Sequence, residues 1–172
     1  MNSNIDLVLF GARGDLSARK LFPALYQLDR AGLLGDSVRI AGLAREAISS
    51  SEFIEKTHEN LKKVVSKSAW DEAAWQRFSR RLTYIKVDFS QKKDFLALKG
   101  WLVEKRTVIY YMATPPSLYG SISKHLDAAG CVDSLSRIVL EKPIGHDLKS
   151  SRDVNSTVGE FFSERNIYRI DH

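Results

Sequence analysis

The residues best suited to chemistry stand near the start of the chain, around two closely spaced glycines. They form the segment Gly11-Ala12-Arg13-Gly14-Asp15-Leu16-Ser17, directly after an apolar run over residues 6–10. Gly11 allows the backbone to turn tightly off a strand, and Gly14 has no Cβ to keep the backbone away from a pyrophosphate. A helix that begins here would direct unpaired N–H groups and its positive dipole end at the anion. Because the spacing is Gly-x-x-Gly-x-x-Ser, an ordinary glycine turn is the alternative interpretation.

The residues after the second apolar run bear on which dinucleotide would bind. The sequence there reads Gly42-Leu43-Ala44-Arg45-Glu46. A carboxylate at this position binds the ribose hydroxyls of NAD, whereas an arginine meets the 2′-phosphate of NADP. Arg45 has a guanidinium suited to bidentate phosphate binding, and Arg13 could add a second cation. NADP is therefore favoured. NAD is the alternative, because Glu46 could bind the ribose hydroxyls. Arg45 could also be only a solvent-facing turn residue.

Strands and helices alternate along the chain and would position these residues. Apolar runs predict strands over residues 6–10, 38–44, 82–87, 107–112, 137–141 and 167–170. Helical spacing of apolar residues predicts helices over residues 16–28, 49–65, 71–81, 117–129 and 150–162, and another marked by Phe95, Leu98 and Leu102. Pro23 predicts a kink or a restart of the first helix, and Ser49 with Glu52 predicts a capping box.

This alternation predicts an α/β fold of the Rossmann type, doubly wound, with a mostly parallel six-stranded sheet and helices on both faces. The strands are almost continuously apolar, as expected for strands buried on both sides. We expect residues 1–172 to form a single dinucleotide-binding domain, because no linker or repeat is visible. The last strand runs directly into Asp171-His172, two polar residues able to do chemistry, which suggests that further protein belongs beyond residue 172.

Composition narrows the classes of function. The 26 basic and 21 acidic residues give a net charge of +5, scattered along the chain rather than gathered in one run. Such an excess suits an anionic small molecule or simply a solvated surface, and no nucleic-acid-binding motif is recognisable. No apolar segment reaches the length of a membrane span, and no signal peptide is recognisable, so we expect a cytoplasmic protein.

Several other residue types favour structural roles. Cys131 is the only cysteine, which excludes an internal disulfide and favours a small buried residue over a nucleophile. His58 and His125 are expected on helix surfaces rather than as ligands. Trp70, Trp75 and Trp101 are expected to be packing residues. No cluster of His, Cys or carboxylate residues has metal-ligand spacing, so no metal site is expected.

Three further segments carry a family resemblance. They are Arg19-Lys20-Leu21, Glu141-Lys142-Pro143-Ile144-Gly145-His146-Asp147 and Tyr168-Arg169-Ile170-Asp171-His172. Together with the glycine segment, they resemble the glucose-6-phosphate dehydrogenase family over the whole chain, in order and in spacing. The last two segments are the most specific to that family.

The resemblance implies an enzyme that oxidises C1 of glucose 6-phosphate to 6-phosphogluconolactone and passes the hydride to NADP, the first oxidative step of the pentose phosphate pathway. It also implies a longer, homo-oligomeric protein whose second domain, beyond residue 172, supplies the dimer contact and the catalytic histidine. The 172-residue chain alone is then expected to be inactive. Two alternatives are another NAD(P)-linked sugar or polyol dehydrogenase and a non-catalytic NADP-binding module.

The resemblance also implies roles for individual residues. The coenzyme would contact Gly11, Ala12, Arg13, Gly14, Asp15, Leu16, Arg45, Ala113, Pro115 and Lys142. The substrate would contact Lys142, His172 and, with less support, Lys20. Asp171 would orient the catalytic histidine, because a carboxylate fixes the imidazole tautomer and stabilises the imidazolium. Pro143 would follow a cis peptide bond, Arg13 departs from the small residue of many relatives, and His146 would be a loop histidine.

Overall fold

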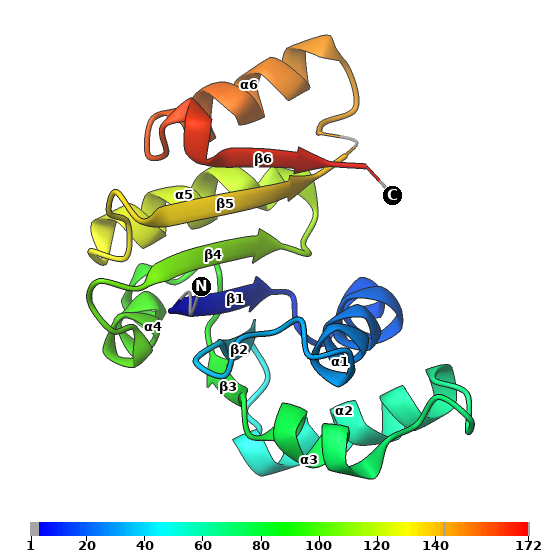
Figure 1. The fold of residues 1–172 in the computed structure, drawn as a ribbon. Coiled ribbons are helices and arrows are strands. Elements are labelled where there is room, and N and C mark those ends of the chain that lie inside the picture. Colours follow the sequence, from blue (N-terminus) through cyan, green and yellow to red (C-terminus); the bar gives the residue numbers. More distant parts are fainter. Residues whose placement is uncertain (1–3, 143, 172) are drawn as a thin grey trace.

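The computed structural model describes residues 4–142 and 144–171, which form a six-stranded sheet (Figure 1). Its strands are β1 (Ile5–Phe10), β2 (Arg39–Ala44), β3 (Leu82–Lys86), β4 (Thr107–Met112), β5 (Ser136–Glu141) and β6 (Ile167–Ile170). The strand order is β3-β2-β1-β4-β5-β6, and every pair of neighbours is parallel. The six strands predicted from the apolar runs are confirmed, each to within one residue at either end.

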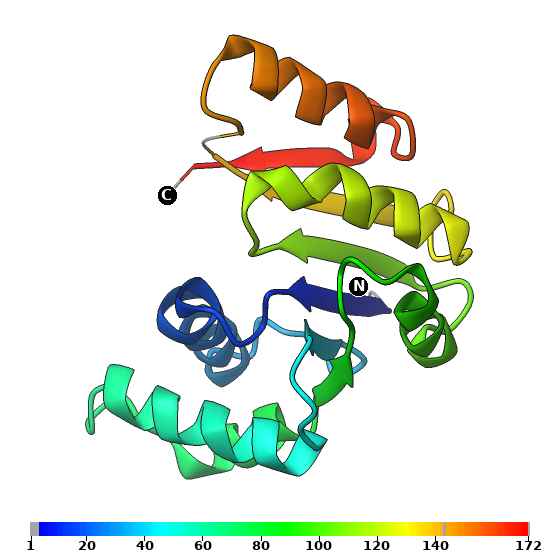
Figure 2. The ribbon, with the colours of Figure 1, turned by 180° about the vertical axis from the view of Figure 1, so that it is seen from behind.

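The helices account for the crossovers between parallel strands. They are α1 (Phe22–Arg30), α2 (Ser50–Val64), α3 (Glu72–Ser79), α4 (Phe95–Trp101), α5 (Tyr119–Ala128) and α6 (Leu148–Gly159). A π-helical turn (Ser17–Leu21) and short 3₁₀ turns (Lys92–Asp94, Pro116–Leu118 and Glu164–Asn166) complete the elements. Figures 1 and 2 show α5 and α6 on the side of the sheet opposite to α1.

Alternation along the strands explains why helices cover both faces. On β1, Leu9 belongs to a core cluster that contains the buried residues of α1, α2 and α3. Its neighbours Val8 and Phe10 point the other way, into a cluster with the buried residues of α4, α5 and α6. Successive side chains of a strand lie on opposite faces, so one apolar strand serves both layers. The predicted doubly wound α/β fold is confirmed.

The first helical segment is irregular next to Pro23. The Phe22 amide donates to the Ser17 carbonyl, a five-residue step typical of a π-helical turn, and α1 begins immediately afterwards with Pro23 in its first turn. Proline is tolerated there because first-turn amides have no intrahelical acceptor. The irregularity predicted at Pro23 is therefore a change from π-helical to α-helical hydrogen bonding just before the proline, within a continuous helical segment.

Two helix starts differ in how well sequence predicted them. Ser49 is the N-cap of α2, and its side chain accepts a hydrogen bond from the Glu52 amide at 3.1 Å, which confirms the N-cap half of the predicted capping box. Helix α6 begins at Leu148, two residues before the predicted start. The reason is that Asp147 caps it: Asp147 accepts from the Ser150 amide at 2.7 Å, and the Ser150 hydroxyl accepts from the Asp147 amide at 3.0 Å.

Both histidines expected on helix surfaces are instead half-buried. The His58 ring stacks on Trp75 with ring centroids 4.7 Å apart, because Trp75 and Trp70 extend the core beneath α2. The Nδ1 atom of His125 lies 3.1 Å from the Phe89 carbonyl oxygen. Periodicity placed both residues on helices but could not show how closely the next loop or helix packs over them. The expected packing role of the tryptophans is confirmed.

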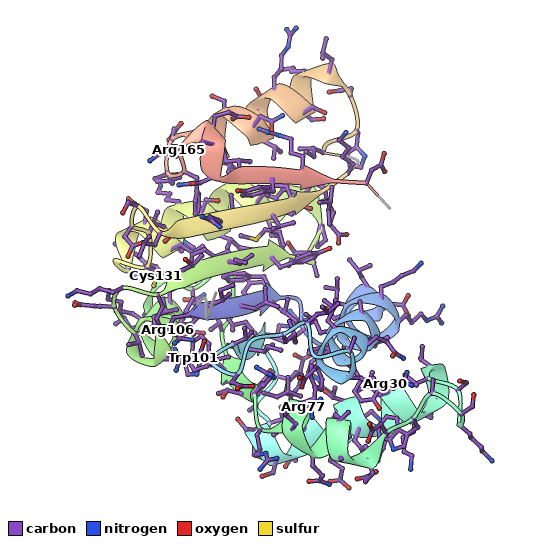
Figure 3. All side chains as sticks on the ribbon, viewed as in Figure 1. Arg30, Arg77, Trp101, Arg106, Cys131 and Arg165 are labelled. Atoms are coloured by element: carbon purple, nitrogen blue, oxygen red, sulfur yellow. The ribbon has the colours of Figure 1, made fainter. Side chains whose placement is uncertain are left out.

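A buried carboxylate ties the amino edge of the sheet together. Asp6 is fully buried and accepts two hydrogen bonds from Arg39, at 2.8 and 2.7 Å, and one from Arg106, at 2.8 Å. The Arg39 guanidinium also lies over the Trp101 ring, 4.0 Å from its centroid. Figure 3 labels Arg106 and Trp101 in this region, next to the start of β1. The opposite edge, where the strands end, is left for the candidate site.

Candidate functional site

The glycine loop is shaped by contacts between three strand ends. Gly11 follows β1 with a φ of 87°, in the left-handed region that favours glycine. Its amide and that of Ala12 both donate to the Leu43 carbonyl of β2 at 3.1 Å. A Cβ on Gly11 would stand 2.3 Å from the carbonyl oxygen of Ala113, which follows β4. The fold itself therefore requires glycine at this position.

Gly14 is a glycine for a different reason. Its amide donates to the Gly11 carbonyl at 3.0 Å, and the Ser17 hydroxyl donates to the same carbonyl at 2.9 Å, which closes the loop. A Cβ on Gly14 would meet only that carbonyl oxygen, at 3.3 Å. The helical segment starts at the next residue, Asp15, so the amides of Asp15 and Leu16 belong to a first turn, where amides lack intrahelical acceptors. The space above Gly14 is thus open to an anion.

Two residues of the loop, Ala12 and Asp15, make contacts elsewhere in the protein. The Ala12 side chain is only 3% exposed and packs in the core, where a Cβ on Gly42 would come within 2.8 Å of it. Ala12 therefore holds the loop against β2. The Asp15 side chain is exposed and pairs with Arg19, one helical turn later, at 2.9 Å. Of the residues predicted in this loop, Gly11, Arg13 and Gly14 line the neighbouring hollow.

That hollow has a volume of about 660 Å³ and lies at the carboxyl ends of β1, β2 and β4. Besides the glycine loop, its walls include Arg45 and Glu46 after β2, and Ala113 and Pro115 after β4. The strand order reverses direction between β1 and β4, and such a switch point is where open α/β sheets bind their ligands. Six of the ten residues predicted to contact a coenzyme thus line one hollow, from three separate segments: Gly11, Arg13, Gly14, Arg45, Ala113 and Pro115. The other four, Ala12, Asp15, Leu16 and Lys142, do not line it.

The outer end of the hollow carries mixed charge. The Arg13 guanidinium lies 3.9 Å from the Glu46 carboxylate, and both side chains are partly exposed. Asp88, after β3, accepts from the Ser90 hydroxyl at 2.7 Å and from its amide at 3.0 Å. These hydrogen bonds, with a further contribution from Arg45, lower the pKa of Asp88. Two guanidinium groups, of Arg13 and Arg45, therefore face the hollow together with the carboxylates of Glu46 and Asp88.

Two more hollows continue along the same edge of the sheet. The next, of about 400 Å³, shares Thr114 and Pro115 with the first and extends to Lys142, after β5. The third, of about 510 Å³, shares Lys142 with the second and reaches Asp171, after β6. In Figure 1 the ends of β4, β5 and β6 lie side by side at this edge. A groove thus leads from the glycine loop past Lys142 to Asp171, and Lys142 stands where its two outer parts meet.

The sequence-predicted substrate residues are only partly gathered here. Lys142 and Asp171 are exposed and share the third hollow. Lys20 is also exposed, but it lies on the π-helical turn and lines none of the three hollows. His172 and Pro143, with its expected cis bond, lie outside the described residues. His146 is exposed in the loop after β5, at the rim of the second hollow.

Sequence reasoning missed the tyrosines that surround the end of β5. The Tyr111 hydroxyl, on β4, donates to Glu141 Oε1, and the Tyr119 hydroxyl lies 3.4 Å from both the amide and the carbonyl oxygen of Glu141. Burial is the main cause that raises the pKa of both phenols, with a further rise at Tyr111 from Glu141. The available signal was the alternation on β4, which places Tyr111 on the opposite face from the fully buried Tyr110.

Two features are absent from residues 4–142 and 144–171. No group of three or more His, Cys, Asp or Glu residues there is arranged to hold a metal ion. Within the same residues, no helix combines the length and the apolar character needed to cross a membrane.

Comparison with known proteins identifies the family. A family model described as glucose-6-phosphate dehydrogenase, NAD binding domain, matches residues 8–172. The chain belongs to the glucose-6-phosphate dehydrogenase family. This agrees with the resemblance read from the glycine loop, the segment around Lys142 and the segment ending at His172, and with the prediction of a dinucleotide-binding fold.

Individual relatives support the assignment. The glucose-6-phosphate 1-dehydrogenases of Dickeya dadantii and Mycolicibacterium smegmatis are 42% and 39% identical to this chain, each over 97% of it. The crystal structure of glucose-6-phosphate 1-dehydrogenase from Mycobacterium avium superposes with a TM-score of 0.90 at 31% identity, over 99% of this chain and 36% of that one. A glucose-6-phosphate dehydrogenase in complex with its substrate glucose-6-phosphate gives a TM-score of 0.89, also at 31% identity, over 99% of this chain and 37% of that one. The chain spans about a third of the length of the curated relatives, 34% and 35% for the two above.

Proposed function

We propose that this chain is the coenzyme-binding part of an NADP-dependent enzyme that oxidises glucose 6-phosphate at C1 to 6-phosphogluconolactone. Membership of the glucose-6-phosphate dehydrogenase family supports the reaction, and one relative was solved with glucose-6-phosphate as its substrate. The observation that carries the proposal for this chain is the groove that joins the glycine loop, Lys142 and Asp171 at one edge of the sheet. It offers adjoining places for two reactants, as hydride transfer requires.

The coenzyme would lie in the hollow beside the glycine loop. The fit rests on Gly14, whose missing Cβ leaves room for a pyrophosphate against the first amides of the helical segment. Arg45, assisted by Arg13, would bind the 2′-phosphate of NADP, since a guanidinium suits a phosphate better than the ribose hydroxyls of NAD. Ala113 and Pro115, at the end of β4, would border the nicotinamide. When bound there, NADP would supply the hydride acceptor.

The sugar would lie further along the groove, around Lys142. The Lys142 ammonium would donate hydrogen bonds to the sugar hydroxyls and to the reacting end of the coenzyme, because Lys142 lines the second hollow, which shares Pro115 with the coenzyme hollow. His172 would bind the phosphate of the sugar, and Lys20 would assist. Asp171 would accept a hydrogen bond from a histidine base that takes the proton of the C1 hydroxyl.

We propose that the histidine base lies in another part of the enzyme. Residues 1–172 would form the dinucleotide-binding domain, and the base, the rest of the substrate site and the dimer contact would belong to a second domain of a homo-oligomeric enzyme. The two-thirds of the relatives' length that this chain does not span support this division.

The proposal is tested by separating coenzyme binding from turnover. The 172-residue chain is titrated with NADP and with NAD while tryptophan fluorescence or heat is recorded, and NADP is expected to bind more tightly. The chain and the full-length protein are then assayed for NADPH formation with glucose 6-phosphate. We expect turnover by the full-length protein only. Failure of the chain to bind either dinucleotide, or turnover by the chain alone, would contradict the proposal.

A further inference from the structure

The end of β5 is fixed from three sides immediately before Lys142. The Tyr111 hydroxyl, from β4, donates to the Glu141 carboxylate. The Tyr119 hydroxyl, from the start of α5, lies 3.4 Å from the amide nitrogen and from the carbonyl oxygen of Glu141. The Lys142 amide donates to the Ile170 carbonyl of β6 at 2.9 Å. The backbone that carries Lys142 is therefore held by two strands and a helix.

Of the contacts that hold the end of β5, the hydrogen bond between Tyr111 and Glu141 joins two side chains, whereas the others involve the backbone. A hydrogen bond from a phenol to an ionised carboxylate is short and stronger than one between neutral groups. Burial and the neighbouring carboxylate raise the pKa of Tyr111, so the phenol keeps the proton it donates. The Tyr111 ring itself packs at the border of the core cluster formed with α1, α2 and α3. The hydroxyl is thus carried by a ring that packs against the core.

The Lys142 side chain has no comparable anchor among the described residues. Its side chain is exposed, and no carboxylate among the described residues lies within ion-pair distance of its ammonium. A lysine side chain is a flexible four-carbon stem with a point charge at its end, so its aim depends on the backbone from which it starts. The Glu141 carboxylate next to it accepts a hydrogen bond from Tyr111.

We infer that Tyr111 is a positioning residue: through the Glu141 carboxylate it fixes the end of β5, and thereby the direction in which Lys142 reaches the reacting groups. This inference rests on the proposed function, in which Lys142 contacts both the sugar and the coenzyme. A misplacement of about 1 Å at such a group is enough to lower a rate by on the order of a hundredfold. A smaller effect is expected here, since Tyr119 and Ile170 still hold the backbone.

The test uses the full-length enzyme, with kcat, both KM values and the dissociation constant of NADP measured for each variant. Tyr111→Phe removes only the hydroxyl and is expected to lower kcat about tenfold, while KM and Kd for NADP stay within about twofold. The matched control is Tyr168→Phe. Tyr168 lies on β6 and is 46% exposed, so the loss of its hydroxyl is expected to leave every constant unchanged. A purely structural role of Tyr111 would weaken coenzyme binding along with kcat.

Two variants of the partner make the inference sharper. Glu141→Gln keeps a carbonyl oxygen that can accept from Tyr111, so it is expected to retain more activity than Glu141→Ala. In the Glu141→Ala background, Tyr111→Phe should cost nothing further, because coupled residues give non-additive losses. Additive losses, equal losses in the two Glu141 variants, or an unchanged kcat in Tyr111→Phe would overturn the inference. A parent enzyme that does not oxidise glucose 6-phosphate would instead refute the proposed function.

Discussion

Gly11 and Ala113, which follow β1 and β4, approach so closely that a Cβ on Gly11 would stand 2.3 Å from the Ala113 carbonyl oxygen. Because the backbone at both positions is held by the sheet, neither residue can move apart from the other without a cost in stability. The same contact brings the two walls of the candidate coenzyme hollow together. One close approach therefore supports both the fold and the site.

Gly11→Ala is accordingly predicted to destabilise the fold. It combines a left-handed backbone, at a φ of 87°, with the clash at Ala113. Together these should lower the free energy of unfolding by about 2 to 5 kcal/mol, measured by urea denaturation. Gly100→Ala is the control: it lies within α4 with open space around it, and the better helix propensity of alanine should add about 0.5 to 1 kcal/mol. Equal stability of the two variants would contradict this explanation of Gly11.

Gly14→Ala is predicted to separate binding from folding. The new Cβ would meet only the Gly11 carbonyl oxygen, at 3.3 Å, so stability should change by less than about 1 kcal/mol. The methyl group would nevertheless occupy the space proposed for the pyrophosphate, and NADP affinity should fall at least about tenfold, or 1.4 kcal/mol. Calorimetric titration of the 172-residue chain measures this. If the variant is stable and binds NADP as tightly as the parent, the proposal that the pyrophosphate binds at this loop is wrong.

Arg45→Ala is predicted to weaken NADP more than NAD. A charge-assisted hydrogen bond contributes about 1.5 to 3 kcal/mol, so the Kd for NADP should rise about 10- to 100-fold, with NAD changed by less than about threefold. Arg13→Ala should have a smaller effect on NADP, because its guanidinium already lies 3.9 Å from Glu46. Arg30→Ala, at the far end of α1, should change neither affinity. An equal loss for both coenzymes would show that Arg45 does not bind the 2′-phosphate.

Local patterns predicted the strands, the glycine loop and the edge where they meet, because each depends on residues near one another in sequence. Local patterns could not predict contacts between residues that lie far apart in the sequence, because these contacts depend on how distant segments pair. The contact of Tyr111 with Glu141 needs the register of β4 on β5, in which Tyr111 faces Val139. The burial of Asp6 needs Arg39 and Arg106, which are 33 and 100 residues away. Lys20 likewise lies on a π-helical turn, which apolar spacing does not reveal.

Asp6→Asn is predicted to be strongly destabilising. Removing the charge leaves Arg39 and Arg106 without their shared buried carboxylate, and breaking such a pair from one side costs about 3 to 5 kcal/mol. The midpoint of urea denaturation should fall accordingly, whereas Asp36→Asn, at an exposed position, should change stability by less than about 0.5 kcal/mol. A loss below about 1 kcal/mol for Asp6→Asn would mean that the two arginines find other partners.

Cys131 is predicted to resist alkylation in the folded chain. Burial raises the pKa of its thiol from 9.0 to about 11, so at pH 8 only about a thousandth of the folded thiol is ionised, against about a tenth of the unfolded one. Iodoacetamide labelling, followed by mass spectrometry, should therefore be far slower without urea than with it. The same shift makes stability fall as pH rises from 9 to 11, because the unfolded state loses its proton first and then binds fewer protons than the folded state. Cys131→Ala should flatten that part of the pH profile. Equal labelling rates with and without urea would show that the thiol is neither buried nor shifted.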